Sequence, residues 1–129
     1  MICTNSQGNR LPEGVTWCAD NECFSEKKYS DVTYLSFLLK WDPEEKQRCL
    51  FAVAPDVVGD APATLTRSTP WFSAIRELGL PVAFVGQDGA EEMLDQIPWG
   101  EFDVWFTGGS TEWKLSPEAE VCLLRAQNE

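Results

Sequence analysis

The sequence predicts an α/β protein in which four βα units are built around a parallel sheet. Short, continuously apolar segments alternate along the chain with segments whose apolar residues recur at helical spacing. The apolar segments lack the strict alternation of half-exposed strands, which is typical of parallel strands buried on both faces. At 129 residues the chain has the length of one domain, so we expect residues 1–129 to form a single domain.

The first unit follows an irregular segment. Residues 1–14 contain glycines and a proline that interrupt regular structure, and residues 15–19 are the first predicted strand. A helix is expected to start at Ser30 or Asp31, either of which can cap it, and to reach about Trp41. Its apolar residues at helical spacing are Val32, Leu35, Leu38 and Leu39.

The second unit begins with the apolar residues 49–54, which predict a strand. Asp60 is expected to cap the helix that follows this strand. Pro70 lies inside that helix and should kink it or split it in two, because proline lacks the N–H that the helix needs. Gly79 is expected to close the second piece.

The third and fourth units complete the pattern. Residues 81–85 predict a third strand, and residues 90–96 predict a short helix after it. Four of the five residues in 102–106 are apolar, so the fourth strand is expected to be buried. It runs into Gly108-Gly109, and the last helix is expected over 116–127.

Four βα units fit two architectures, and the residues leave both open. One is half of a TIM (βα)8 barrel, and the other is a small doubly wound sheet. In both, the sheet is parallel and its crossover connections are right-handed. Both place ligands at the carboxyl ends of the strands, so candidate functional residues are expected there.

The composition excludes several kinds of site. The chain has no histidine, which removes Cys/His zinc sites and imidazole acid–base chemistry, and we expect no metal. Its five cysteines, an odd number without a secretion signal, argue against a disulfide framework. No apolar run approaches the ~20 residues of a membrane span, so we expect a cytoplasmic protein with no membrane partner. The net charge of −11 repels phosphate backbones and, by itself, argues against nucleic acid.

Polar residues and glycines collect where the four predicted strands end. In a parallel sheet these ends share one edge, where carboxylates, an amide and bare backbone amides suit a flat polar heterocycle. Taken singly, each of these residues also suits a turn, a cap or a loop, so it is the set that predicts a site. The set consists of Asp20-Asn21, Asp56, Gln87-Asp88 and Gly108-Gly109.

In this order the strand ends resemble the tRNA-guanine transglycosylase (queuine tRNA-ribosyltransferase) family, and more closely its phage-type relatives that put 7-deazaguanines into DNA. The segment Ala19-Asp20-Asn21-Glu22-Cys23-Phe24-Ser25 is similar to the family's motif after an early strand, with Glu22-Cys23 in place of its glycine pair. The resemblance gives Asp20 the catalytic position, where it contacts the base or acts as acid–base. It makes Asp56, Gln87, Gly108 and Gly109 substrate-binding residues.

The family exchanges a base at a glycosidic bond on a βα barrel, without a redox cofactor. The resemblance therefore implies no cofactor and a pocket for guanine or a 7-deazaguanine, with DNA or tRNA as the nucleic acid. The family's nucleophile is an Asp on a later strand, and no residue of this chain matches it. We therefore expect a truncated or split half barrel, inactive alone, whose open edges are covered by a second polypeptide or by a homodimer.

Two other functions stay open. The high negative charge and the missing nucleophile also suit a non-enzymatic acidic interaction module, for example a phage protein that binds a host protein. Asp20 and Asp56 could instead be the paired carboxylates of a self-contained hydrolase.

Overall fold

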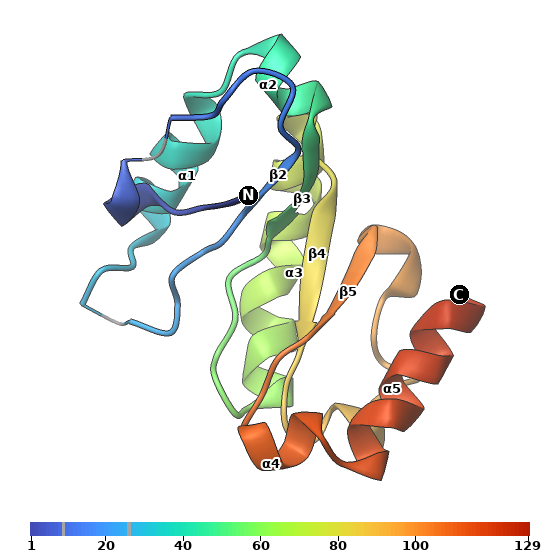
Figure 1. Cartoon of the computed structure of the whole chain (residues 1–129). Coiled ribbons are helices and arrows are strands. Elements are labelled where there is room, and N and C mark those ends of the chain that lie inside the picture. The colour runs from blue at the N-terminus through green and yellow to red at the C-terminus, as the bar shows by residue number, and fades with distance from the viewer. Residues whose placement is uncertain (9, 26) are drawn as a thin grey trace.

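The computed structural model describes residues 1–8, 10–25 and 27–129 and shows an α/β fold around one parallel sheet (Figure 1). The sheet has five strands in the order β1-β2-β3-β4-β5, and every neighbouring pair is parallel. The strands are β1 (Ile2–Cys3), β2 (Trp17–Ala19), β3 (Cys49–Val53), β4 (Val82–Gly86) and β5 (Val104–Thr107). The predicted α/β class and parallel sheet are confirmed.

The order of the strands decides between the two predicted architectures. It follows the order of the chain, as in a βα barrel, whereas a doubly wound sheet reverses direction at a switch point. The described part of the chain thus forms a half TIM-like βα fold. Residues 1–14, predicted to be irregular, contribute the edge strand β1, whose two residues are too few to show a pattern.

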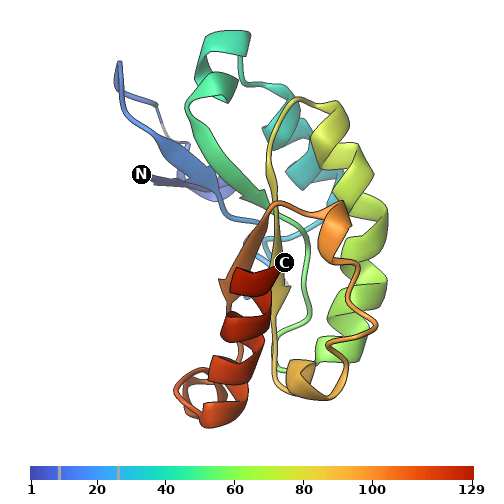
Figure 2. The same ribbon diagram turned by 90° about the vertical axis from the view of Figure 1, so that its right-hand side faces the viewer.

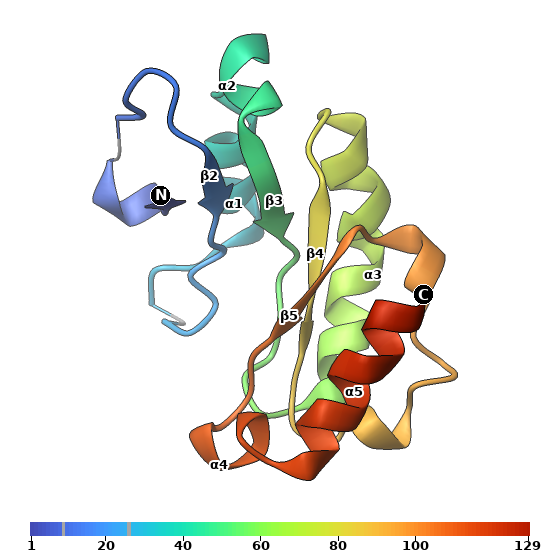
Figure 3. The ribbon, with the colours of Figure 1, turned by 45° about the vertical axis from the view of Figure 1, so that its right-hand side comes forward.

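The helices cover one face of this sheet. Figures 1 and 2 show α1 and α3 on the same side of the strands, and Figure 3 shows α1 behind β2 and β3 and α3 beside and behind β4. The described helices are α1 (Asp31–Leu39), α2 (Pro43–Gln47), α3 (Ala61–Glu77), α4 (Thr111–Lys114) and α5 (Pro117–Asn128), with 3-10 turns η1 (Asn5–Gln7), η2 (Ala90–Glu92) and η3 (Trp99–Glu101).

The ends of the longer helices follow the predicted signals. Ser30 caps α1, its hydroxyl accepting a hydrogen bond from the backbone N–H of Thr33. Asp60 caps α3, accepting from the N–H of Ala63. Gly79 follows the last turn of α3 with a φ of 83°, a left-handed conformation that glycine adopts without strain.

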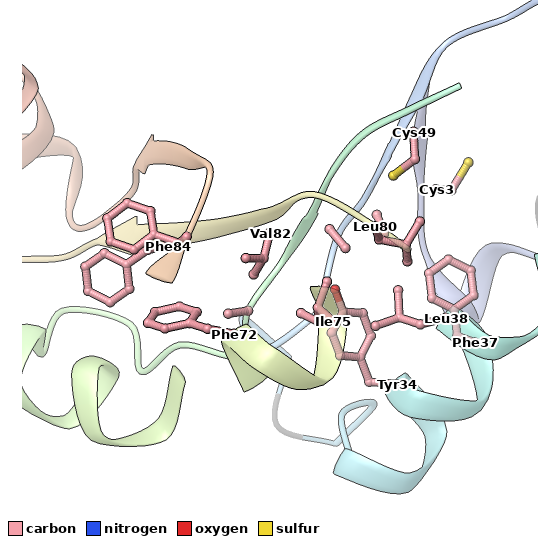
Figure 4. Close-up of a cluster of buried hydrophobic side chains, with 14 of the residues drawn as sticks. Cys3, Tyr34, Phe37, Leu38, Cys49, Phe72, Ile75, Leu80, Val82 and Phe84 are labelled. Atoms are coloured by element: carbon pink, nitrogen blue, oxygen red, sulfur yellow. The ribbon is translucent and has the colours of Figure 1, made fainter. Parts of the chain in front are cut away.

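The main core lies between the sheet and the helical layer. Figure 4 shows Tyr34, Phe37 and Leu38 of α1 meeting side chains of α3 and the strands. This corrects the predicted face of α1: Leu38 is buried, but Val32, Leu35 and Leu39 are exposed. The aromatic residues Tyr34 and Phe37 shift the buried stripe around the helix by packing against the sheet and α3.

Two further predictions about helices need correction. Pro70 does not divide α3, which runs unbroken from Ala61 to Glu77 and buries Phe72 and Ile75 beyond the proline in the core. The core contacts of these residues keep the helix continuous although Pro70 donates no backbone bond. The helix expected over 90–96 is only the 3-10 turn η2.

The strand β5 is not buried as predicted. Phe106 is 44% exposed, and the other residues of the strand are partly buried. Alternate residues of β4 and β5 face opposite sides of the sheet, so one side joins the main core and the other carries a small cluster with Val53, Ala83 and Val85. Residues on that second side of the sheet line a pocket.

Candidate functional site

Of the predicted strand-end residues, all except Asp88 line one pocket at the carboxyl edge of the sheet. Asp20 follows β2, Asp56 follows β3, Gln87 follows β4, and Gly108 and Gly109 follow β5; all five line the pocket. Its volume is about 330 Å³, which falls in the usual range of small-molecule sites. The parallel sheet brings these residues together although they are spread over most of the chain.

The pocket walls are mainly apolar and come from the open face of the sheet. Phe51 and Phe106 pack edge to face with ring centroids 6.1 Å apart. Phe24, in the loop after β2, also lines the pocket and is 88% exposed, so its ring is available to a ligand. The other apolar lining residues are Ile2, Cys18, Ala19, Val53, Val58 and Val85.

A buried hydrogen-bond network fixes the carboxylate of Asp56. Asn21 Nδ2 donates to Asp56 Oδ1 at 2.8 Å, and Gln87 Nε2 donates to Asp56 Oδ2 at 2.6 Å. The exposed fractions of Asn21, Asp56 and Gln87 are 5%, 8% and 2%. The network therefore ties together the loops that follow three adjacent strands.

The two amides of the network have fixed orientations. Asn21 Nδ2 also donates to the carbonyl of Ala54 at 2.9 Å, while its Oδ1 accepts from the N–H of Cys23 at 2.8 Å. Gln87 Oε1 accepts from the N–H of Gly59 at 2.9 Å. Turning either amide over would set donor against donor, so Asn21 and Gln87 can present only N–H groups to Asp56.

Burial of Asp56 has an electrostatic consequence. Loss of solvent raises the pKa of the Asp56 carboxyl above its ordinary value, and the hydrogen bonds from Asn21 and Gln87 offset part of this rise. The nearby charge of Asp20 raises this pKa further. The guanidinium of Arg67 donates to the main-chain carbonyl of Asp56 and holds this loop to α3.

Asp20 differs from Asp56 in being free to meet a ligand. It is partly exposed, lines the pocket, and forms no side-chain hydrogen bond with another residue in the ranges 1–8, 10–25 and 27–129. Its carboxylate can therefore accept hydrogen bonds from a bound molecule without breaking contacts within the described chain.

The glycine pair after β5 is required for packing. A Cβ at Gly108 would lie 2.6 Å from Val85 Cγ1, and one at Gly109 would lie 2.7 Å from both Asp88 Oδ1 and Trp113 Cε3. Gly109 also has a φ of 84°. Asp88 in turn accepts from the backbone N–H and hydroxyl of Ser110, so the glycines let the end of β5 close onto the loop after β4.

Sequence reasoning missed two residues of the pocket and only partly recognised a third. Phe24 and Lys114 line it but were given no role of their own, and Asn21 was recognised only as a strand-end polar residue. The sequence could have pointed to Lys114, because it is a cation six residues after Gly108 in a strongly acidic chain. Glu112, which follows the glycine pair, is exposed and is not among the residues that line the pocket.

Metal-ligand clusters and membrane-spanning helices are both absent from the described part of the chain. There, no three His, Cys, Asp or Glu residues are grouped so as to hold a metal ion. All five cysteines are free thiols; burial raises the pKa of Cys49 to about 12 and that of Cys122 to about 11. None of the described helices has the length and apolar character needed to span a bilayer.

Comparisons with known proteins gave no match. No family model, curated protein or solved structure matches this chain. The function is therefore argued from the fold and from the geometry of the pocket.

Proposed function

We propose that the pocket binds a planar purine-like base and that the chain is a transglycosylase-like protein for guanine or 7-deazaguanine exchange in nucleic acid. The observation that carries the proposal is the free carboxylate of Asp20 in an apolar, aromatic-lined pocket beside the fixed carboxylate of Asp56. A guanine-type base presents ring N–H and amino donors on one edge and two apolar faces. The carboxylates match that edge, and Phe24 can stack on a face.

Asp20 and Asp56 have different roles in this proposal. Asp56 is held by two amides that cannot turn over, so it is a preorganised acceptor for the edge of the base. Asp20 has no such constraint and can exchange a proton with the base as the glycosidic bond breaks or forms. The fixed position of Asp56 also makes it a poor partner in a hydrolase of paired carboxylates, in which both groups must move protons or attack.

Base exchange also needs a nucleophile at C1′, and we assign that group to a second polypeptide. The sheet supports this, because β1 and β5 each pair with only one described strand and leave edges to be covered. The exchange replaces one C1′–N bond by a C1′–O bond to the nucleophile, which the incoming base then displaces. DNA or tRNA carries the exchanged base, and the five free thiols suit the reducing cytoplasm.

Calorimetric titration of the purified chain with guanine and 7-deazaguanine tests the pocket. We expect binding that Asp20→Asn weakens by about 1.5–3 kcal/mol, the value of a hydrogen bond to a charged group. Phe24→Ala should weaken it by about 1–3 kcal/mol through lost stacking. Val32→Ala, which changes a 75% exposed residue of α1 outside the pocket, is the matched control. Absence of binding, or equal loss in the control, refutes the proposal.

The assignment of the nucleophile has its own test. Guanine-containing DNA or tRNA incubated with labelled 7-deazaguanine should show no exchange when this chain is the only protein. Exchange by the chain alone would refute the need for a second component, while leaving the base pocket intact as a proposal.

A non-enzymatic interaction module remains the second candidate because of the apolar residues on the outer helix surfaces. Val32, Leu35 and Leu39 are exposed on α1 at helical spacing, and Val121 and Leu124 are exposed on α5. The titration separates the two candidates, because a protein-binding module has no need to bind guanine or to respond to Asp20→Asn.

A further inference from the structure

Lys114 is the one cationic side chain among the described residues that line the pocket. It ends α4, directly after the glycine pair, and is exposed. The pocket otherwise carries the carboxylates of Asp20 and Asp56, in a chain with a net charge of −11. Lys114 therefore places a positive charge in a pocket whose other charged residues are negative.

The charge of Lys114 is not used within the described chain. Its ammonium forms no salt bridge or side-chain hydrogen bond with the residues outside positions 9 and 26. Three arginines show the contrast, because Arg48, Arg76 and Arg125 are each paired with carboxylates. The charge of Lys114 is therefore available to a ligand.

Lys114 also lies where the pocket adjoins a second groove. The same residue lines a neighbouring groove of about 220 Å³ between the end of β5 and α5, together with Thr107, Ser116, Leu123 and one acidic residue, Glu120. A base seated among Phe24, Asp20 and Asp56 would carry its substituent past Lys114 into this groove. The groove is open, so the substituent need not be small.

We infer that Lys114 is a specificity-determining residue that binds a phosphate on the sugar of a bound nucleotide, so that the pocket prefers nucleotides over free bases and nucleosides. This inference rests on the proposed base pocket and names the ligand class it selects. The phosphate can come from a mononucleotide or from a nucleic-acid strand, which present the same anionic oxygens to the ammonium. Lysine suits this contact, because its three donors adapt to either source.

The test compares guanosine, guanosine 5′-monophosphate and a short single-stranded DNA containing one guanine. Calorimetry at low ionic strength should show the phosphate-bearing ligands binding about tenfold tighter than guanosine, a difference of about 1.4 kcal/mol. Lys114→Gln should remove this gain, weakening the binding of the phosphate-bearing ligands about tenfold more than the binding of guanosine. Higher salt should shrink the gain in the unaltered protein, because an exposed ion pair is screened.

Lys46→Gln is the matched control. Lys46 lies on α2, which precedes β3 and so lies at the amino edge of the sheet, and this substitution changes the net charge by the same amount. A gain with the monophosphate identifies a mononucleotide phosphate as sufficient, and a gain with the oligonucleotide alone identifies the strand; both support the inference.

Equal affinity for all three ligands, or equal effects of Lys114→Gln and Lys46→Gln, overturns the inference while the base pocket stands. If guanine and guanosine also fail to bind, the base pocket itself fails, and the role of Lys114 fails with it.

Discussion

The hydrogen-bond network around Asp56 predicts a specific failure and a specific rescue. Asp56→Asn preserves shape but replaces one acceptor oxygen by a donor. Asn21 and Gln87 both present N–H groups to this position and are held in that orientation by Cys23 and Gly59. The new amide can therefore satisfy one neighbour and must oppose the other.

The size of the effect follows from what is lost. One charge-assisted hydrogen bond, worth about 1.5–3 kcal/mol, disappears, and a buried donor without an acceptor costs about 1–3 kcal/mol. The variant is spared the cost of burying a charge, which offsets part of the loss. We expect Asp56→Asn to lower the free energy of unfolding by about 2–4 kcal/mol.

A second substitution should restore the network. Gln87→Glu supplies an oxygen that can accept from the new amide of Asp56→Asn, while its other oxygen still accepts from Gly59. The double variant Asp56→Asn/Gln87→Glu should therefore recover most of the lost stability. Gln87→Glu alone should be destabilising, because it sets two buried carboxylates against each other.

Urea denaturation with an unchanged slope measures these differences. Asp60→Asn is the matched control, because asparagine caps a helix as well as aspartate does and should change stability by less than about 0.5 kcal/mol. If Asp56→Asn were no more harmful than Asp60→Asn, or if the double variant were less stable than Asp56→Asn, the network would not have the geometry described.

Three further outcomes are expected. Gly109→Ala should destabilise the fold by at least about 1–2 kcal/mol because of its positive φ, whereas Gly100→Ala, with open space around it, should change stability little in thermal unfolding. Burial alone would raise the pKa of Asp103, but hydrogen bonds from Arg76 and the backbone hold it below its ordinary value. This contribution is present at neutral pH and lost as pH falls through the lowered pKa, so the stability deficit of Asp103→Asn should shrink in acid; a pH-independent deficit would contradict this sign. Leu38→Ala should cost about 2–5 kcal/mol in chemical denaturation and Leu35→Ala, on the exposed side of α1, much less; equal costs would contradict the buried face.

The sequence predicted the elements whose signals lie within a few residues of one another. Ser30, Asp60 and Gly79 mark helix ends because each satisfies or reshapes the backbone of its own turn. Continuous apolar runs mark the strands of a parallel sheet, and their parallel direction places Asp20 and Asp56 at one edge. These inferences need no knowledge of what packs against each element.

The tertiary structure decided everything that depends on a partner distant in the chain. Packing partners decide which face α1 buries, how exposed Phe106 is and whether α3 continues through Pro70. The periodicity of the sequence does not identify those partners. The same holds for the site. That Gln87 supports Asp56, and that Asp20 and Lys114 have no side-chain partner in the described part of the chain, follows only when the segments after four strands fold onto one sheet edge, because hydrogen bonds between side chains depend on spatial neighbours.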